Sequence, residues 1–404
     1  MRILFITSLF FSCPPKDGSS IRTFNLIKQL SKNNDIVLIC IKEKSKPKDD
    51  LPELKKYCSQ IIILDFERPK KIMNYLLNMF SLKPFFVWVK YDKRIQQVMD
   101  NMVKENQFDL IHIDGLAGAQ FALAYDDMPK IIDARDAIWL SHNRQMRNNK
   151  NVLLKTYSRL KLFRLKKYEL KIYSQFDRVV FISKVDEQTI FSLSSGKLDN
   201  LATIPFGVDI SKIEPNKYDS KPLSLVFTGN MPYGPNKDAM LYFCRDIFPE
   251  IKREIPNVKL YIVGRDPGPE VQNLSREGDI IVTGEVEDMK AWLEKSTLFV
   301  CPLRYGSGMK IKVLEAMAMA KPIVSTSIGV DGIRVRNGED VFIADDAASF
   351  ALRTVELLRD EKLRNRFGEN SRKLVKEEYT WEIASSKFNN LYSEVIDSYP
   401  QKYI

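Results

Sequence analysis

The stretch LFVCPLRYGSGMKIKVLEAMAMA, residues 298–320, joins an apolar run of strand length to a glycine loop and a helix-forming segment. Its two glycines let the backbone approach a ligand closely, and the free N–H groups of a helix N-terminus attract an anion. Arg304, Lys310 and Lys312 surround this loop. Because cations at a helix N-terminus oppose the helix dipole, their clustering favours a bound anion such as a diphosphate. A solvated basic turn is the alternative interpretation.

Glu315 lies further along the same helix, among small and apolar neighbours. A carboxylate in such surroundings is either paired or used for function. Glu315 could accept hydrogen bonds from both hydroxyls of a ribose, or it could form an ion pair with Lys312, one turn earlier. The residue pattern leaves both interpretations open.

Outward from this stretch, apolar runs of strand length alternate with amphipathic segments, which predicts parallel α/β domains. The segment 204–209, followed by polar residues 211–221, has the composition of a linker between two halves. A long helix is expected over Arg147–Ser174. The expected strands of the first half are Arg2–Ser8, Asp35–Ile41, Ile61–Asp65, Asp109–Asp114, Lys130–Ala134 and Asp177–Ser183. Those of the second half are Leu223–Gly229, Lys259–Gly264, Ile280–Gly284, Leu298–Leu303, Pro322–Ser327 and Val341–Ala344, with helices over Asn236–Arg253, Glu287–Glu294 and Met309–Ala320.

Composition narrows the class of protein. A chain of 404 residues fits two domains, and no run approaches the roughly 18 to 20 apolar residues that span a bilayer. The net charge of +10 suggests an acidic partner, namely nucleic acid, anionic lipid or a phosphorylated substrate. No nucleic-acid module motif is present, which argues against the first of these. The apolar start of the chain resembles a first strand more than an export signal.

Cysteine and histidine usage excludes several kinds of site. The five cysteines are scattered and the histidines number only two, so neither a disulfide framework nor a zinc site is predicted. This composition fits a reducing, cytoplasmic location. The chain has no Asp-x-Asp motif, so we expect neither a metal requirement nor a separate cofactor.

Several motifs together resemble glycosyltransferase family 4, and more narrowly the bacterial sugar transferases of exopolysaccharide and exosortase systems. The resemblance covers nearly the whole chain, and its most specific part is Gly306–Ala318. It is carried by Val282–Val286, Pro302–Ala318, Lys321–Thr326, Phe227–Met231 with Pro235 and Asn236, Val263–Pro267, Phe176–Ser183, the linker Pro205–Asp209, and Tyr379–Glu382.

The resemblance implies the GT-B fold, in which two Rossmann-like, doubly wound α/β domains face a central cleft. Residues 1–204 would form the acceptor-side domain and residues 205–378 the donor-binding domain. Residues 379–404 would form a helix that crosses back to the first domain. The implied activity is a hexosyltransferase-type, retaining transfer from a nucleotide-sugar to a glycan or lipid-linked acceptor in cell-surface polysaccharide biosynthesis.

The resemblance also implies roles for individual residues. Glu315 matches the second glutamate of the family's E-x7-E motif, which holds the donor ribose, whereas the first glutamate falls on Ser307. A common family arginine falls on Asn230, which shifts phosphate binding to Arg304, Lys310 and Lys312. The implied catalytic residues are Asp114, Lys310 and Glu315. The implied donor-binding residues are Gly18, Gly229, Asn230, Gly264, Val286, Arg304, Gly306, Ser307, Gly308, Met309 and Lys312.

In the first half, Asp114 takes the position of a catalytic histidine of the family, at the end of an expected strand. Alternation along that strand puts His112 on the same side, where a core role is equally consistent. Gly18 follows the first strand, and Ser19 or Ser20 would cap the next helix if that glycine only forms a turn. Asp133, Arg135 and Asp136 end a neighbouring strand, where a structural ion pair is favoured over a role in the cleft.

Arg147–Tyr173 carries nine basic residues and one acidic residue. Such a helix either packs with a solvated basic face or meets an anionic membrane surface, so association with the inner face of the plasma membrane is an open expectation. Two other functions also stay open. A catalytically impaired GT-B partner protein would explain Ser307 and Asn230, whereas an NAD-type oxidoreductase is disfavoured because no Gly-x-Gly-x-x-Gly follows the first strand.

Overall fold

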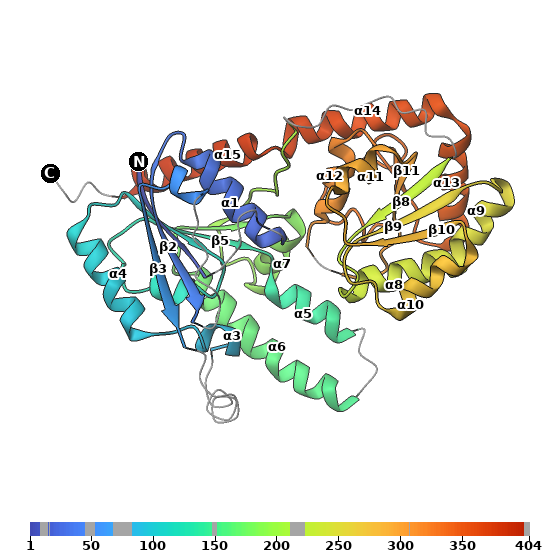
Figure 1. Cartoon of the computed structure of the whole chain (residues 1–404). Helices are drawn as coiled ribbons and strands as arrows, with labels where there is room; N and C mark the ends of the chain where they lie inside the picture. Colours follow the sequence, from blue (N-terminus) through green and yellow to red (C-terminus); the bar gives the residue numbers. More distant parts are fainter. Residues whose placement is uncertain are drawn as a thin grey trace. The chain divides into compact units, whose positions relative to one another are not determined.

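A computed structural model describes residues 1–8, 15, 17–44, 53–67, 83–147, 152–210, 223–306 and 308–399. The chain divides into two compact units (Figure 1). Unit 1 consists of Met1–Pro205 together with Trp381–Ile404, and unit 2 consists of Phe206–Thr380.

Unit 1 is built on a parallel sheet, which in the described residues has the order β3-β2-β1-β4-β5-β6-β7. Its strands are β1 (Arg2–Thr7), β2 (Asp35–Glu43), β3 (Gln60–Phe66), β4 (Leu110–Asp114), β5 (Lys130–Arg135), β6 (Arg178–Phe181) and β7 (Leu201–Thr203). The order reverses between β1 and β4, which makes this a doubly wound sheet. Strand β7 was not predicted, because three half-buried residues give too little pattern.

Most described helices of unit 1 connect these parallel strands, and one comes from the end of the chain. They are α1 (Gly18–Leu30), η1 (Leu54–Lys56), α3 (Phe85–Trp88), α4 (Lys93–Glu105), η2 (Ala119–Phe121), α5 (Ile138–Arg147), α6 (Val152–Tyr173), α7 (Lys184–Leu193) and, from the end of the chain, α15 (Trp381–Ser398). The single long helix expected over Arg147–Ser174 is therefore only α6, and α5 is a separate helix before it.

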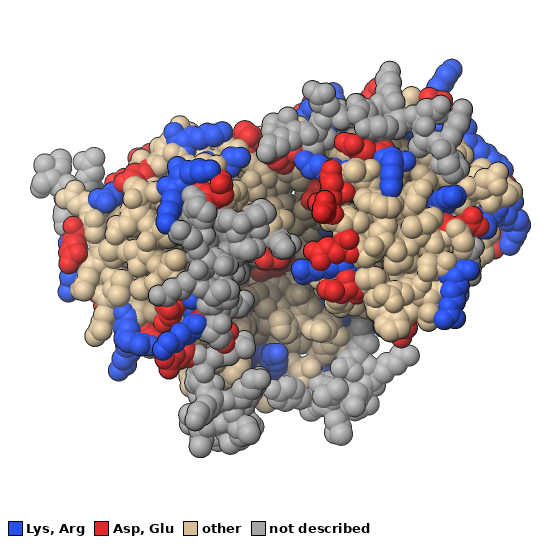
Figure 2. Space-filling view, viewed as in Figure 1, with Lys and Arg blue, Asp and Glu red and all other residues tan. Residues whose placement is uncertain are grey.

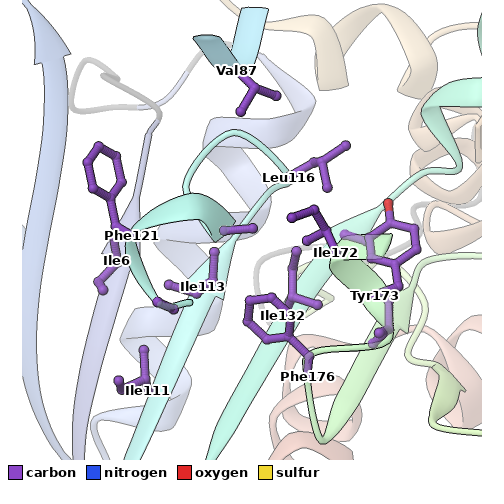
Figure 3. Packing of buried hydrophobic residues seen from close by; sticks show 14 of the residues in the cluster. Ile6, Val87, Ile111, Ile113, Leu116, Phe121, Ile132, Ile172, Tyr173 and Phe176 are labelled. Atoms are coloured by element: carbon purple, nitrogen blue, oxygen red, sulfur yellow. The ribbon is translucent and has the colours of Figure 1, made fainter. Parts of the chain in front are cut away.

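The core of unit 1 forms because strands that are covered on both faces are apolar almost throughout. Figure 3 shows part of it, where Ile6, Ile111, Ile113 and Ile132 from three neighbouring strands meet aromatic side chains from the connections. These include Phe121, and Tyr173 and Phe176 from the end of α6 and the loop after it.

Helix α15 packs on unit 1 although it follows unit 2 in the chain. It contacts α1 and lies beside it in Figure 1. Tyr392 of α15 forms a hydrogen bond of 2.7 Å with Nδ1 of His112 on β4, and both side chains are buried. The His112 ring stacks on Phe5, with 4.2 Å between ring centroids. His112 is therefore a core residue that ties the last helix to the sheet.

Unit 2 is built on a second parallel sheet, with the order β10-β9-β8-β11-β12-β13 in the described residues. Its strands are β8 (Ser224–Thr228), β9 (Lys259–Val263), β10 (Ile280–Gly284), β11 (Leu298–Cys301), β12 (Ile323–Ser325) and β13 (Phe342–Ile343). Here the order reverses between β8 and β11. Helix α8 and helix α12 follow these two strands and lie on opposite sides of the sheet in Figure 1.

The helices of unit 2 are α8 (Gly234–Tyr242), η3 (Phe243–Ile247), α9 (Phe248–Glu254), α10 (Pro269–Gln272), η4 (Asn273–Glu277), α11 (Met289–Glu294), α12 (Ile311–Ala318), α13 (Ala347–Arg359) and α14 (Glu361–Glu378). The helix expected over Asn236–Arg253 contains a π-helical turn, η3, between α8 and α9. Helix α12 begins two residues later than expected, so Lys310 is its N-cap rather than a residue of its first turn.

Among the described helices, none combines the length and the apolar content that crossing a bilayer requires. Within the same residues, no group of three or more His, Cys, Asp or Glu side chains is arranged to hold a metal ion. On the face seen in Figure 2, basic and acidic side chains are interspersed over each unit.

Candidate functional site

The candidate donor site lies at the carboxyl edge of the second sheet. Parallel strands end at the same edge, and the loops after β8, β9, β10 and β11 carry the predicted residues Gly229, Gly264, Val286 and Gly306, respectively. Strands β8 and β11 flank the point at which the sheet order reverses. Ligands of doubly wound sheets bind at such a point. Val286 is partly buried in the loop after β10.

Gly229 and Gly264 bring two of these loops into close contact. A Cβ atom on Gly264, which has a φ of +154°, would lie 1.8 Å from the carbonyl oxygen of Gly229. A Cβ atom on Gly229 would lie 2.7 Å from Nζ of Lys312 and from Nδ2 of Asn236. Both positions therefore need glycine, because a side chain would displace either backbone or a polar group of the site.

The glycine loop before α12 has the backbone that its sequence predicts. Gly306 has a φ of +137° and Gly308 a φ of +71°, both in the region that favours glycine. Ser307 lies outside the described residues. Met309 is buried, and Lys310 is largely buried and donates from Nζ to the carbonyl oxygen of Gly308. The loop thus places the Lys310 side chain against its own backbone at the start of α12.

Lys312, in the first turn of α12, points toward the end of β8. Its Nζ donates to Oδ1 of Asn236 at 2.7 Å and lies 4.1 Å from the centre of the Phe227 ring. Burial lowers the pKa of Lys312 to about 8, with Cys301 and Glu315 opposing that change and Lys310 adding to it. This ammonium group is therefore partly removed from water and held by a neutral partner.

Glu315 is partly buried one turn further along α12. Burial raises the pKa of its carboxyl group to about 7, against the opposing effect of Lys290 and Lys312. Within the described residues, neither Glu315 nor Lys312 has an ion-pair partner within 4.0 Å. The ion pair that the sequence left open between these two residues is thus not formed, and the Glu315 carboxylate is available to a ligand.

Arg304 was expected to join Lys310 and Lys312 in a cluster of three cations, but it is already paired. It pairs with Asp238 of α8, at 3.0 Å from Nε and 2.5 Å from Nη2, and stacks over the ring of Tyr242. The glycine loop is therefore flanked by two lysines and by an arginine whose charge is already balanced. Lys237, on α8, pairs with Glu270.

In unit 1, the predicted carboxylates at the sheet edge are held by neighbouring side chains. Asp114, at the end of β4, is 2% exposed, and its Oδ2 accepts hydrogen bonds from Thr7 at 2.7 Å and from Thr23 at 2.8 Å. Its Oδ1 lies 3.7 Å from Nε of Arg135, which has a φ of +67°. Burial alone would lower the pKa of Arg135, but Asp114 and the neighbouring carboxylates raise it overall.

Asp133 forms a buried ion pair with Arg22 of α1, with 2.7 Å between Nε and Oδ2. Arg22 also donates to the carbonyl oxygens of Ile204 and Pro205, at the end of the first segment of unit 1. The interpretation of Asp133 as an ion-pair residue is thus the one that the structure favours. Gly18 is the first residue of α1, and the cap of that helix is Asp17, whose side chain accepts from Ser20, rather than Ser19 or Ser20.

Comparison with known proteins agrees with this geometry. Residues 222–360 match the family described as glycosyl transferases group 1. Over nearly its full length the chain superposes on solved structures: sucrose-phosphate synthase from Thermosynechococcus elongatus gives a TM-score of 0.68, 15% identity, and coverage of 98% of this chain and 100% of that one. Anabaena Alr3699/HepE in complex with UDP and glucose gives a TM-score of 0.66 and 14% identity, with coverage of 98% of this chain and 100% of that one. The chain is a glycosyltransferase with the GT-B fold, and its second half matches the group 1 family.

Curated relatives are similar to parts of this glycosyltransferase. An uncharacterized 44.6 kDa protein in the cps region of Klebsiella pneumoniae is 25% identical over 281 residues, 65% of this chain and 69% of that protein. The capsular polysaccharide biosynthesis glycosyltransferase CapM of Staphylococcus aureus is 26% identical over 232 residues, 54% of this chain and 60% of that protein.

Two residues of the candidate site were missed from the sequence. Asn236 holds Lys312, and Arg265 donates from Nε to Oδ1 of Asn230 at 3.2 Å. Both stand in stretches that carry the family resemblance, next to the loops after β8 and β9. Their contacts depend on which loops meet in space, so the only available signal was their position just after a strand.

Proposed function

We propose that this glycosyltransferase transfers a sugar from a nucleotide-sugar to a glycan or lipid-linked acceptor, with retention at the anomeric carbon, in cell-surface polysaccharide biosynthesis. The observation that carries the proposal is the pair of opposite charges on α12. Lys312 and Glu315 stand beside the glycine loop, and no described residue balances either charge within 4.0 Å. A nucleoside diphosphate presents phosphates to the first group and ribose hydroxyls to the second.

The diphosphate would lie at the N-terminus of α12, close to the ammonium groups of Lys310 and Lys312. Both cations stabilise the negative charge that develops on the leaving diphosphate, and they act in a site that is partly removed from water. Glu315 accepts hydrogen bonds from the ribose and orients the nucleoside. Hydrogen bonds donated to a carboxylate favour its ionised form, so bound ribose offsets the raised pKa of this group.

Transfer breaks the bond between the anomeric carbon and the diphosphate oxygen and forms a bond to the acceptor oxygen on the same face of the sugar. The proton of the acceptor hydroxyl passes to an oxygen of the departing diphosphate. Since the lysines supply the charge that a metal ion would supply, and the chain lacks an Asp-x-Asp motif, we expect turnover to persist in the presence of EDTA. Direct contact of Asp114 with the reacting sugar stays a prediction.

A thermal-shift screen tests this proposal. UDP, GDP, ADP and their sugars are added singly, because a ligand that binds only the folded protein stabilises it, by about 2.7 kcal/mol at 100 times its Kd. We expect one base to raise the melting temperature, and its sugar conjugate to be hydrolysed slowly without acceptor. No shift with any nucleotide would refute donor binding. A shift without any hydrolysis or transfer would instead support a catalytically impaired partner protein.

We also propose that unit 1 associates with the anionic inner face of the cell membrane through α6. Leu160 and Phe163 are 61% and 55% exposed, one turn apart on this helix. Arg159, Lys161 and Lys167 are exposed beside them, and Nζ of Lys167 lies 4.5 Å from the centre of the Phe163 ring. Apolar side chains flanked by cations suit the boundary between headgroups and acyl chains, where a lipid-linked acceptor would be found.

A further inference from the structure

Asn236 connects the two elements that form the donor site. It lies on α8 and is 5% exposed. Its Nδ2 donates to the carbonyl oxygen of Asn230, just after β8, at 2.8 Å. Its Oδ1 accepts from Nζ of Lys312, on α12, at 2.7 Å. One amide therefore spans the gap between the end of a central strand and the helix that carries Lys312 and Glu315.

We propose that Asn236 is a positioning residue of the donor site, which holds the Lys312 ammonium group at the carboxyl end of β8, facing the diphosphate. The proposal rests on the function proposed above, since it assigns Lys312 to the phosphates. Asn236 itself acts through Lys312.

The amide side chain suits this position for a physical reason. An aspartate here would form an ion pair with Lys312 and neutralise the charge that the phosphates need. An apolar residue would leave a half-buried ammonium group without its acceptor, which is costly. The neutral amide satisfies one proton of the ammonium group and leaves the full positive charge.

The groups around Lys312 determine the pKa of its ammonium group. Phe227 of β8, Cys301 of β11, Lys310 at the start of α12 and Glu315 within α12 are the groups that face it besides Asn236. Burial lowers the pKa of Lys312 to about 8, so the ammonium group is lost as pH rises through that value. Changing the charge at Asn236 should move this titration most, because Asn236 contacts Nζ of Lys312 directly.

A merely structural role is the alternative. Asn236 would then serve only to fasten the loop after β8 through Asn230, and substitutions would loosen the fold without moving the titration of Lys312. Two substitutions separate the cases because they change the acceptor in opposite ways. Asn236→Asp places a carboxylate against Nζ and raises the pKa of Lys312 by about one unit or more. Asn236→Leu removes the acceptor and lowers that pKa.

The first experiment needs no ligand. Trace acetylation of the full chain between about pH 6 and pH 10, followed by mass spectrometry with fragment ions that separate Lys312 from Lys310, gives the midpoint at which the Lys312 amine becomes reactive. We expect the midpoint to be highest in Asn236→Asp, intermediate in the wild type and lowest in Asn236→Leu. The matched control is Asn25→Asp on α1, where the Asn25 amide donates to the carbonyl oxygen of Ile21, and this change should leave the midpoint unchanged.

The second experiment measures binding of inorganic pyrophosphate by calorimetry over the same pH range. The protonation of pyrophosphate itself changes identically in every sample, so any difference in affinity between variants comes from the protein. The midpoint of affinity loss should follow the order of the acetylation midpoints, and Lys312→Arg should remove this loss. Unmoved acetylation midpoints, with or without pyrophosphate binding, would overturn the positioning role. Midpoints that move while the wild type binds neither pyrophosphate nor any nucleotide would refute the proposed function and, with it, the assignment to phosphate.

Discussion

Charged side chains stand at the carboxyl edges of both sheets, but their partners differ. In unit 1, Asp114 and Asp133 are buried and satisfied by Thr7, Thr23 and Arg22. In unit 2, Lys312 and Glu315 are only partly buried and lack an ion-pair partner among the described residues. The pKa values follow this difference, since those of Lys312 and Glu315 move toward neutrality, to about 8 and about 7.

The comparison teaches that charge at a strand end is not sufficient evidence of a binding site. An ion pair that is complete within the fold stabilises the sheet edge. Two opposite charges that do not pair with each other remain available to a ligand that has both an anionic group and hydrogen-bond donors. On this argument, substitutions at the first edge change mainly stability, and those at the second change mainly ligand binding and turnover.

The largest expected effect comes from Asp133→Asn. This change leaves the buried Arg22 guanidinium without its counter-charge, which typically costs about 3–5 kcal/mol. Differential scanning calorimetry should show the transition of unit 1 moving to lower temperature. The control is Glu67→Gln, which removes an exposed pair with Lys44 and should change stability by less than about 1 kcal/mol. Equal effects of the two changes would contradict the description of the first edge.

The next largest expected effect is a loss of stability at acid pH, caused by His112 in unit 1. Burial lowers the pKa of His112 to about 4, below its ordinary value of 6.5, so the folded state binds fewer protons than the unfolded state between those values. Its contribution is present above about pH 6.5 and is lost as pH falls toward about 4, up to about 3 kcal/mol. Thermal unfolding at a series of pH values should show a flatter acid limb in His112→Gln. An unchanged limb would show that the imidazole titrates as in water.

Glu315→Gln should separate function from stability. Loss of a hydrogen bond to a charged group costs about 1.5–3 kcal/mol, so kcat/KM should fall roughly 10- to 150-fold. Because the folded-state pKa of Glu315 is raised, the wild type loses stability as pH rises from about 4.5 to about 7. The variant avoids this loss and should melt no lower than the wild type at pH 8. Wild-type kinetics, or a lower melting temperature, would show that Glu315, like Asp133, serves stability rather than ligand binding.

Sequence pattern was sufficient for much of this architecture, for reasons that particular elements make clear. Parallel strands such as β1 and β8 are buried on both faces, so they appear as apolar runs bounded by loop residues. The glycine loop was predictable because Gly306 and Gly308 must adopt positive φ before a helix. The short edge strand β7 gave a weak pattern, because only three residues pair there.

The partners of the site residues could not be read in the same way. Arg304 and Lys312 lie eight residues apart beside one loop, yet one pairs with Asp238 and the other bonds to Asn236, both on α8. Which of them faces a ligand depends on how α8 packs against the loop, and spacing along the chain does not encode it. The same applies to Asp17, which caps α1 where a serine was expected.

The smallest expected effect concerns the exposed cations of α6, Arg159, Lys161 and Lys167. Each cation near an anionic surface contributes about 1 kcal/mol, screened within a Debye length of about 8–10 Å. Lys161→Gln with Lys167→Gln should therefore weaken co-sedimentation with anionic vesicles several-fold, and Phe163→Ser should weaken it at high and low salt alike. All of these side chains are exposed, so stability should change by less than about 0.5 kcal/mol per site. Lys373→Gln on α14, equally exposed but in unit 2, is the matched control and should bind vesicles as the wild type does. Binding that ignores salt and anionic lipid content, or no binding at low salt, would leave α6 as scaffold and confine function to the second sheet edge.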